Sequence, residues 1–288
     1  MSEGLLAFLR RDLRDDLAAG AERDPARSQG GAVWLLIWAL AAAATGISLY
    51  QLSGYHTGFV SLNELAALAP DRLWEWLTML GDERVAFALT LLFARRHPRL
   101  FWTLVCAALV AAAYSRGLKP LFDALRPPAV LPSDAFNLIG PERRRESFPS
   151  GHSVTAAVFF GLLVYYARRL HWRLLFLVLG LLAGLSRVAL GVHWPVDVAA
   201  GLAGGALAAL VGVWLSRHSP WGIDHVILHL ILVGIASIMA LSLWFDDSGY
   251  VGAANLLRVL SVVCLTSAFV SYFLRPVWKA SKRGAGSG

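Results

Sequence analysis

Two apolar segments joined by a short polar stretch, RLLFLVLGLLAGLSRVALGVHWPVDVAAGLAGGALAALVGVWL at residues 173–215, decide the fold. Crossing the hydrocarbon core of a membrane takes about 20 predominantly apolar residues, and both segments approach that length. The stretch between them, 186–197, carries arginine, histidine and aspartate. Ionisable side chains are costly to hold near a bilayer, so those that occur there are candidates for function. The sequence thus predicts two membrane helices that meet at a polar site.

Apolar segments of this length recur along the whole chain. Its 288 residues are 57% hydrophobic and only 16% charged, a composition outside the range of soluble proteins. The second segment is interrupted by Gly81-Asp82-Glu83-Arg84, so its first part fits a re-entrant or interfacial piece as well as a straight span. We expect an all-α, polytopic transmembrane helical bundle with eight spans, near residues 32–52, 73–94, 100–118, 152–168, 173–191, 195–215, 224–244 and 253–274.

The chain divides into four parts on this basis. The N-terminal tail, 1–31, has leucines at helical spacing, which fits either an amphipathic helix on the membrane surface or a solvated cytoplasmic helix. A core of six spans covers 32–215 and two additional spans cover 216–275. A short cytoplasmic tail, 276–288, ends the chain.

Basic residues gather on one side of the expected membrane and account for the net charge of +7. They cluster in both tails and in alternate loops, and loops rich in Lys and Arg face the cytoplasm. Both termini are therefore expected inside. Nucleic acid is not expected as a partner, because such binding needs a solvated basic face, which this chain has little of. The bias towards Ala, Leu and Arg with short loops suggests a bacterial inner-membrane protein.

Three polar clusters fall at the outer face in this topology. Lys119 and Arg126 lie at the outer end of the third span, and 149–152 lies at the outer start of the fourth. The third cluster, 186–197, lies at the outer junction of the fifth and sixth spans. Their convergence at one depth of the membrane predicts a single site that faces the exterior.

The first cluster pairs two cations. Lys119 and Arg126 are seven residues apart, so on a continuous helix both would project from one face until Pro127-Pro128 stops that helix. Arginine offers a planar fork and lysine a point charge, a combination that suits a phosphate. The alternative is that both are interfacial anchors of a membrane helix.

The second cluster, Pro149-Ser150-Gly151-His152, directly precedes an apolar run. Ser150 fits the N-cap of a helix, and the free backbone N–H groups of a first helical turn form an anion site. Gly151 allows a ligand to approach the backbone, and His152 is suited to giving a proton to a leaving group. A capped helix start with an interfacial histidine is the alternative.

The third cluster contains a histidine and a carboxylate at helical spacing. His193 and Asp197 are four residues apart, and Pro195 between them fits the first turn of a helix, so the two side chains can meet. A carboxylate that binds one imidazole nitrogen leaves the other free to attack. Arg187 would supply charge to the reacting group. An interfacial arginine beside an ordinary helix start is the alternative.

Together, Lys119-x6-Arg126-Pro127, Pro149-Ser150-Gly151-His152 and Ser186-Arg187-x5-His193-x3-Asp197 resemble the three-part signature of the type 2 phosphatidic acid phosphatase superfamily. This superfamily comprises integral-membrane lipid phosphate phosphatases and their haloperoxidase relatives. All three parts match at every defining position and in the family order. The resemblance covers about residues 32–215, and the seventh and eighth spans have no counterpart in the minimal family plan.

The resemblance implies roles for the residues that match. His193 corresponds to the nucleophile that becomes a phosphohistidine, Asp197 to the residue that orients it, and His152 to the general acid for the leaving alkoxide. The phosphate cradle of the family, which stabilises charge on the phosphoryl oxygens, corresponds to Lys119, Arg126, Ser150, Gly151 and Arg187. Water then hydrolyses the phosphohistidine, and no metal or other cofactor is implied.

A phosphorylated lipid in the bilayer is the expected substrate, because a site at the outer ends of membrane helices meets phosphates at headgroup level. The resemblance offers undecaprenyl diphosphate, phosphatidylglycerol phosphate, phosphatidic acid and lipid A phosphates. Arg143, Arg144 and Arg145 in the outer loop break the usual charge rule. They fit headgroup contacts with a second phosphate, or pairing with anionic lipid.

Two other functions remain compatible with the sequence. A phosphotransferase would use the same histidine intermediate and pass the phosphoryl group to a lipid acceptor. A transporter would use the charges to line a path, although it gives no reason for a His-Asp pair beside a helix-terminal anion site, and no inverted repeat is visible.

Two histidines near the inner start of the seventh span, His225 and His229, have the spacing of metal ligands. They lie on the inner side, away from the three clusters, and polar residues at a helix start are ordinary. We therefore expect no metal site there.

Overall fold

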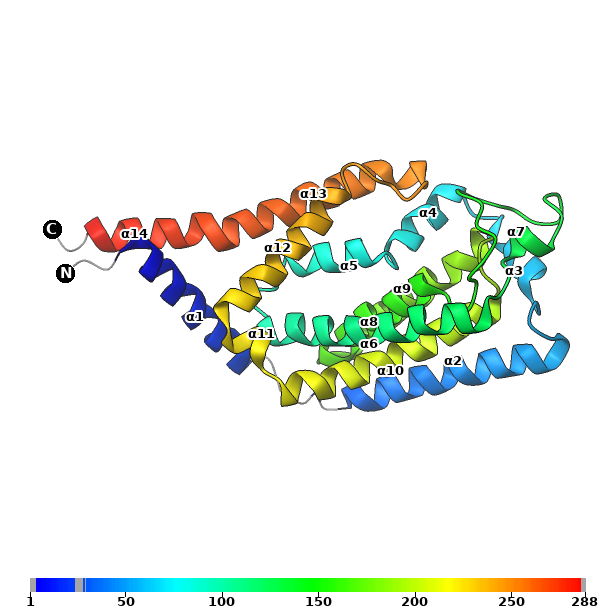
Figure 1. The fold of residues 1–288 in the computed structure, drawn as a ribbon, viewed down its shortest axis with the longest axis horizontal. Coiled ribbons are helices and arrows are strands. Elements are labelled where there is room, and N and C mark those ends of the chain that lie inside the picture. The colour runs from blue at the N-terminus through cyan, green and yellow to red at the C-terminus, as the bar shows by residue number, and fades with distance from the viewer. Residues whose placement is uncertain (1–3, 24–27, 29, 286–288) are drawn as a thin grey trace.

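The computed structural model describes residues 4–23, 28 and 30–285, and every regular element in these ranges is a helix (Figure 1). Five helical stretches are long and apolar enough to cross a membrane, namely Gly31–Ser53, Pro98–Val130, Leu170–Ala189, Pro195–His218 and Val251–Lys282. Two shorter apolar helices, Gly151–Tyr166 and Val226–Ser242, lie beside them. The predicted all-α, polytopic bundle is therefore confirmed.

Helices lie at each of the eight expected spans, but five helical stretches of the described residues, rather than eight, are long and apolar enough to cross a membrane. A 3-10 turn at Val251–Ala253 precedes α13, and a π-helical turn at Val270–Leu274 joins α13 to α14. The elements are α1 (Leu5–Arg23), α2 (Gly31–Ser53), α3 (Phe59–Ala66), α4 (Asp71–Met79), α5 (Glu83–Thr90), α6 (Pro98–Phe122), α7 (Pro127–Val130), α8 (Gly151–Tyr166), α9 (Leu170–Ala189), α10 (Pro195–His218), α11 (Trp221–Asp224), α12 (Val226–Ser242), α13 (Ala254–Phe269) and α14 (Arg275–Ala285).

The second expected span is two short helices rather than one. The chain breaks between α4 and α5, where Asp82 caps α5 by accepting a hydrogen bond from the Arg84 N–H at 2.7 Å. Gly81 makes the break possible, because a side-chain carbon there would lie 2.7 Å from the carbonyl oxygen of His152. The interruption expected at this tetrapeptide is confirmed, and it brings the break against the start of α8.

Helix α10 lies at the centre of the core and packs against α2, α6 and α8. Its small residues allow close contact: a side-chain carbon at Gly205 would lie 2.4 Å from the carbonyl oxygen of Val154 in α8. Small residues serve this purpose in membrane bundles, where lipid is as apolar as the side chains and close packing drives association. The close approach holds the starts of α8 and α10 side by side.

The N-terminal tail forms helix α1, as its leucine spacing predicts, and this helix packs against other helices of the protein. Leu13 and Leu17 are buried and form a small cluster with Val226 of α12. Arg95 binds the carboxylates of Asp12 and Asp16 at 2.5 and 2.8 Å. The part of the apolar face of α1 that holds Leu13 and Leu17 thus packs on protein, whereas Leu5 and Leu6 are exposed. Helix α1 lies at the end of the bundle where both termini lie (Figure 1).

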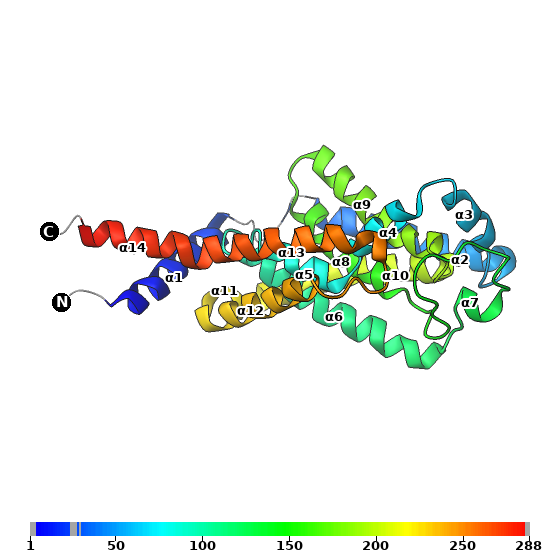
Figure 2. The ribbon, with the colours of Figure 1, turned by 90° about the horizontal axis from the view of Figure 1, so that it is seen from above.

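The last helices form a layer on one side of the core. Helices α12 and α13 pack against α5, and α13 continues into α14, which extends past the bundle towards the chain termini (Figure 2). The loop between α12 and α13 returns to the opposite end, beside α4 (Figure 1).

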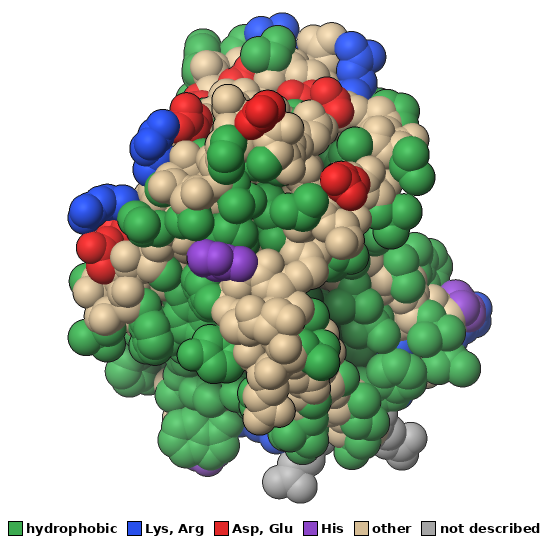
Figure 3. Space-filling model, turned by 90° about the vertical axis from the view of Figure 1, so that its right-hand side faces the viewer, with side chains coloured by type: hydrophobic (Ala, Val, Ile, Leu, Met, Phe, Trp, Pro, Cys, Tyr) green, Lys and Arg blue, Asp and Glu red, His purple; other side chains and the backbone are tan. Residues whose placement is uncertain are grey.

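The loops at the end opposite the termini carry the three polar clusters. Figure 3 views this end, where acidic and basic side chains gather in the upper part and hydrophobic side chains cover most of the lower part. The connections before α3, α7, α8, α10 and α13 all lie here (Figure 1). One end of the bundle therefore holds every residue that the sequence singles out for chemistry.

Candidate active site

His193 lies buried in the short connection between α9 and α10, with a different partner at each ring nitrogen. Its Nδ1 is 3.3 Å from Asp197 Oδ2, and its Nε2 is 3.1 Å from Nη1 of Arg126. An arginine only donates hydrogen bonds, so Nε2 must accept and carry a lone pair. The proton then resides on Nδ1 and faces the carboxylate. The predicted His-Asp pair is present, in the tautomer that a nucleophile requires.

Asp197 is held by three further donors. The Ser147 hydroxyl donates to its Oδ2 at 2.5 Å and the backbone N–H of Trp194 donates to the same oxygen at 2.9 Å. The Tyr55 hydroxyl donates to Oδ1. A buried carboxylate needs such donors to remain ionised. They fix its position and therefore that of the His193 ring.

The electrostatic surroundings keep His193 neutral. Burial lowers the pKa of His193 well below its usual range, and the charges of four surrounding residues lower it further. These residues are Arg126, Arg187, His152 and Lys119. All four were singled out in the sequence. Two of them also contact His193 directly, since Arg126 binds its Nε2 and the His193 N–H donates to the Arg187 carbonyl at 3.2 Å. The three clusters thus form one site.

Arg126 is fixed by backbone carbonyl groups rather than by a carboxylate. Its Nε donates to the Arg145 carbonyl at 2.7 Å and its Nη2 to the Glu146 carbonyl at 3.1 Å. Neutral acceptors orient a guanidinium group and leave its charge for an anion. The continuous helix considered for Lys119 and Arg126 does not form: α6 ends at Phe122, and Asp123 takes a left-handed φ of 35°. The two cations converge through the loop instead.

The second cluster begins α8 as predicted. Ser150 is the N-cap, and its Oγ accepts hydrogen bonds from the backbone N–H and the hydroxyl of Ser153 at 3.4 and 2.8 Å. The Ser150 N–H donates to the Asp197 carbonyl at 3.1 Å, which ties α8 to the start of α10. Gly151 opens the helix, and its open first turn presents N–H groups to an anion.

Two nitrogens of the site lack hydrogen-bond partners among the described residues. They are Nε2 of His152 and Nε of Arg187, and both are buried. Buried polar atoms are nearly always hydrogen-bonded, so these two nitrogens are available to bind a ligand that enters the site. Both nitrogens suit contact with a phosphoryl group or its leaving oxygen.

Arg187, in the last turn of α9, is held by hydroxyl groups. Its Nη1 donates to Thr78 Oγ1 at 2.7 Å and to the Tyr250 hydroxyl at 3.0 Å. Thr78 belongs to α4, and Tyr250 belongs to the loop before α13. The side chain is buried, with 2% of its surface exposed.

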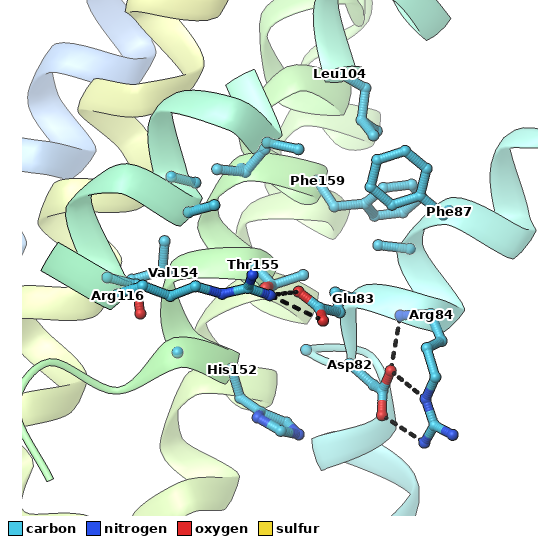
Figure 4. A pocket seen from close by; sticks show the side chains of 18 of the residues that line it. Asp82, Glu83, Arg84, Phe87, Leu104, Arg116, His152, Val154, Thr155 and Phe159 are labelled. Atoms are coloured by element: carbon cyan, nitrogen blue, oxygen red, sulfur yellow. Dashed lines mark hydrogen bonds and ion pairs between the residues drawn. The ribbon is translucent and has the colours of Figure 1, made fainter. Parts of the chain in front are cut away.

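A cavity of about 440 Å³ opens beside the site, between α5, α6 and α8. Figure 4 shows His152 and the pair Asp82–Arg84 at one end of the cavity and Leu104 with Phe87 at the other. Lys119 and Gly151 also line it. The cavity is therefore polar at the end where His152 and Lys119 lie with Asp82 and Arg84, and apolar at the other end.

The three arginines of the outer loop differ in their ion-pair partners. Arg144 pairs with Glu142 at 2.7 Å and Arg145 with Asp123 at 3.2 Å, both on the exposed surface. Arg143 has no ion pair within the described ranges and lies close enough to Arg126 for the two charges to repel each other. Lys119 lies 3.8 Å from Glu146.

Sequence reasoning missed several residues that hold the site together. Tyr55, Thr78 and Tyr250 come from loops and helices far from the motifs, and no spacing links them to the residues they bind. Ser147 lies three residues before Ser150. Its position next to the second cluster is the only feature of the sequence that could have indicated its role. At the inner end, His229 donates to or accepts from the Tyr272 hydroxyl at 2.8 Å. The described ranges contain no group of His, Cys, Asp and Glu suited to a metal ion.

Comparison with known proteins identifies relatives of the part that carries the clusters. Residues 99–221 match the model of the PAP2 superfamily. The undecaprenyl-diphosphatase of Sulfolobus acidocaldarius is 28% identical over 182 residues, which cover 60% of this chain and 80% of that protein. The lipid A 1-phosphatase of Rhizobium johnstonii is 44% identical over 66 residues, or 23% of this chain and 26% of that protein.

Among solved structures, Aquifex aeolicus LpxE matches with a TM-score of 0.48 and 28% identity, covering 54% of this chain and 93% of that one. The family match begins at the start of α6 and ends at α11, so it contains Lys119, Asp197 and all three clusters between them. Helices α12 and α13 lie outside it. Residues 99–221, which hold all three clusters, are therefore similar to the PAP2 superfamily.

Proposed function

We propose that this protein is an integral-membrane lipid phosphatase that hydrolyses a phosphomonoester or diphosphate through a phosphohistidine on His193. The observation that carries the proposal is the position of the His193 ring, with Nδ1 3.3 Å from Asp197 Oδ2 and Nε2 3.1 Å from Nη1 of Arg126. Relatives named as an undecaprenyl-diphosphatase and a lipid A 1-phosphatase support the substrate class.

The first step forms the phosphohistidine. The negative charge of the bound phosphate favours the protonated form of His152. The Nε2 lone pair of His193 then attacks phosphorus, the bond from phosphorus to the leaving oxygen breaks, and protonated His152 gives its proton to that oxygen. Asp197 stabilises the positive charge that the His193 ring acquires. The lipid alcohol, or the lipid monophosphate in the case of a diphosphate, is the first product.

The cations stabilise the charge on the phosphoryl oxygens. Arg126 donates to Nε2 of His193 while the site is free, so this hydrogen bond must pass to a phosphoryl oxygen when Nε2 attacks. Arg187 offers its unpartnered Nε. Lys119, the Ser150 hydroxyl and the first turn of α8 at Gly151 complete the cradle. Such preorganised donors are worth the most where water is excluded.

The second step releases inorganic phosphate. Water attacks the phosphohistidine, the bond between phosphorus and Nε2 breaks, and its electron pair returns to the ring. His152, deprotonated in the first step, takes a proton from that water, as microscopic reversibility requires. These residues carry out both steps, so the proposal invokes no metal.

An amphiphilic substrate fits the cavity beside the site. Its polar end lies at His152 and Lys119, and its apolar part is lined by Phe87, Leu104 and Phe159. A phosphate at the polar end would leave a tail along the apolar wall. Undecaprenyl diphosphate, phosphatidylglycerol phosphate, phosphatidic acid and lipid A phosphates all have this character.

The proposed location is the bacterial inner membrane, with the site facing the exterior or periplasm. The basic residues at the end that carries both termini support this orientation, because Lys and Arg accumulate on the cytoplasmic side. Arg95, Arg96 and Arg99 lie there with the two terminal helices.

The test is the release of inorganic phosphate by purified protein in detergent from a panel of lipid phosphates. Wild-type protein should release phosphate with or without a chelator, and His193→Ala should abolish release. His171→Ala is the matched control, because His171 is exposed and lies in α9 away from the site. Equal activity in wild type and His193→Ala, or complete loss on chelation, would sink the proposal.

The same assay separates hydrolysis from phosphotransfer. A hydrolase releases phosphate at the same rate whether or not a lipid acceptor is added. A phosphotransferase using the same intermediate would release little phosphate until the acceptor is present, and would then form a new phospholipid. Acid-labile labelling of the protein by substrate, lost in His193→Ala, would identify the intermediate.

A further inference from the structure

Arg187 is a buried cation whose hydrogen bonds, among the described residues, go only to neutral groups. Its Nη1 donates to Thr78 and Tyr250 hydroxyls at 2.7 and 3.0 Å, and no carboxylate pairs with it in this part of the chain. A carboxylate in their place would neutralise the guanidinium group and compete with a phosphate. Hydroxyl acceptors fix its direction while its charge stays available.

The Tyr250 side chain is rigid enough to fix that direction. It is 2% exposed, and a side-chain carbon at Gly140 would lie 2.5 Å from its ring. The guanidinium carbon of Arg187 lies 5.9 Å from the ring centroid, so both the ring and the hydroxyl contact the same cation. Tyr250 N–H also donates to the Asp247 carbonyl at 3.0 Å, which fixes the backbone beneath it.

The loop that carries Tyr250 is anchored to the break between α4 and α5. Arg84 binds Asp246 at 3.0 Å and the Ser248 hydroxyl at 2.6 Å, and it binds Asp82 at 3.0 Å on the other side. Trp76 Nε1 donates to the Gly252 carbonyl at 3.0 Å. Loop 243–253 and the α4–α5 break are thus one connected unit, and it supplies both acceptors of Arg187.

Neither acceptor belongs to the segment 99–221 that matches the family. Thr78 precedes it, and Tyr250 follows it in the loop between the last two membrane helices, α12 and α13. Those helices have no residue in the three clusters. Their outer loop nevertheless contacts the one cradle residue of α9.

We propose that Tyr250 is a positioning residue that aims Arg187 at the phosphoryl group, and that α12 and α13 serve to complete the phosphate site from outside the family segment. This inference rests on the proposed function. Helices α12 and α13, which lie outside the matched segment, would thus contribute to catalysis.

The test compares Tyr250→Phe with Tyr272→Phe. Both substitutions remove one hydroxyl from a mostly buried tyrosine in the C-terminal part, but the Tyr272 hydroxyl binds His229 at 2.8 Å. Tyr250→Phe should lower kcat/KM about ten-fold, since a hydrogen bond to a charged group is lost. It should weaken inhibition by orthovanadate, an oxyanion probe, by a similar factor. Tyr272→Phe should leave both values unchanged.

A double-mutant cycle with Arg187→Gln distinguishes positioning from general stability. If Tyr250 acts through Arg187, Tyr250→Phe should cause no further loss in the Arg187→Gln background. The temperature of unfolding should fall equally in the two tyrosine variants. Wild-type kinetics and vanadate inhibition in Tyr250→Phe would overturn the inference, as would a full additional loss in the Arg187→Gln background.

Failure of this inference can be told apart from failure of the proposed function. Loss of phosphate release in His193→Ala tests the phosphatase, whereas Tyr250→Phe tests only how Arg187 is held. If the protein releases no phosphate from any lipid, direct binding of orthovanadate to wild type and Tyr250→Phe still decides the inference. Equal affinities would then overturn it.

Discussion

The Tyr55 hydroxyl donates a hydrogen bond to the carboxylate of Asp197, 142 positions further along the chain. Tyr55 stands in the connection between α2 and α3, and Asp197 in the first turn of α10. Asp197 in turn binds Nδ1 of His193. The connection after the first membrane helix therefore reaches the proposed nucleophile through a single carboxylate.

Tyr55→Phe is expected to lower kcat about ten-fold while the protein stays folded, because one donor to Asp197 is lost. Burial, followed by the charge of Asp197, raises the pKa of Tyr55, so its hydroxyl keeps its proton and remains a donor at neutral pH. Steady-state kinetics and the unfolding temperature check this. Tyr50→Phe, at an exposed α2 position without a side-chain hydrogen bond to the described residues, should match wild type.

Asp197→Asn is expected to lower kcat by about 100-fold or more, because an amide can present its NH2 group to Nδ1 and favour the wrong tautomer. With the NH2 group in place of Oδ2, the Ser147 hydroxyl and the Trp194 N–H would also lose the oxygen that accepts their hydrogen bonds. Single-turnover formation of the phosphohistidine is the measurement. Formation at the wild-type rate would contradict the role assigned to the carboxylate.

The pH dependence should follow the lowered pKa of His193. Burial is the main cause, and the charge of Arg126 comes next. His193 loses its lone pair only when the pH falls through that lowered pKa, so its acid limb in kcat/KM should lie below pH ~6.5. Removing a nearby cation with Lys119→Gln should move the limb to higher pH. A limb from His193 above pH ~6.5 would contradict this electrostatic account.

The three arginines of the outer loop should differ in their effect on diphosphate substrates. Arg143→Gln is expected to raise KM for a lipid diphosphate several-fold more than for a monophosphate, because its charge is unpaired within the described ranges and lies near Arg126. Arg144→Gln and Arg145→Gln should have smaller effects, since both cations already pair with exposed carboxylates. Equal effects of all three would favour a general attraction to anionic lipid.

Gly81→Ala is expected to reduce both stability and activity. The added carbon would lie 2.7 Å from the His152 carbonyl oxygen, so α8 or the α4–α5 break must shift, at a cost of about 1–3 kcal/mol. Gly234→Ala in α12 is the control, because an added carbon there meets no atom within 4 Å. Thermal unfolding and kcat of the two variants should diverge, and identical behaviour would contradict the close contact at Gly81.

The positions of the spans could be predicted because the length of an apolar run is a local property of the chain. The break at Gly81-Asp82 was also visible, since glycine and a charged residue interrupt an apolar run in any setting. Whether a helix continues from Lys119 to Arg126 could not be predicted from the local sequence. The helix ends because Asp123 takes a left-handed conformation that turns the chain, and Arg126 then binds a carbonyl group of the loop.

By itself, the sequence determined the helical class and the approximate spans, which follow from run length. It also predicted His193, Asp197, His152 and Arg187 as site residues, from short-range spacing and from the resemblance to a known signature. Only the tertiary structure decided what holds them: Tyr55 on Asp197, and Thr78 and Tyr250 on Arg187. Each of these contacts joins elements distant in the chain through one hydrogen bond. A lone hydrogen bond leaves no periodic pattern in the sequence, so packing had to bring its partners together before it could be seen.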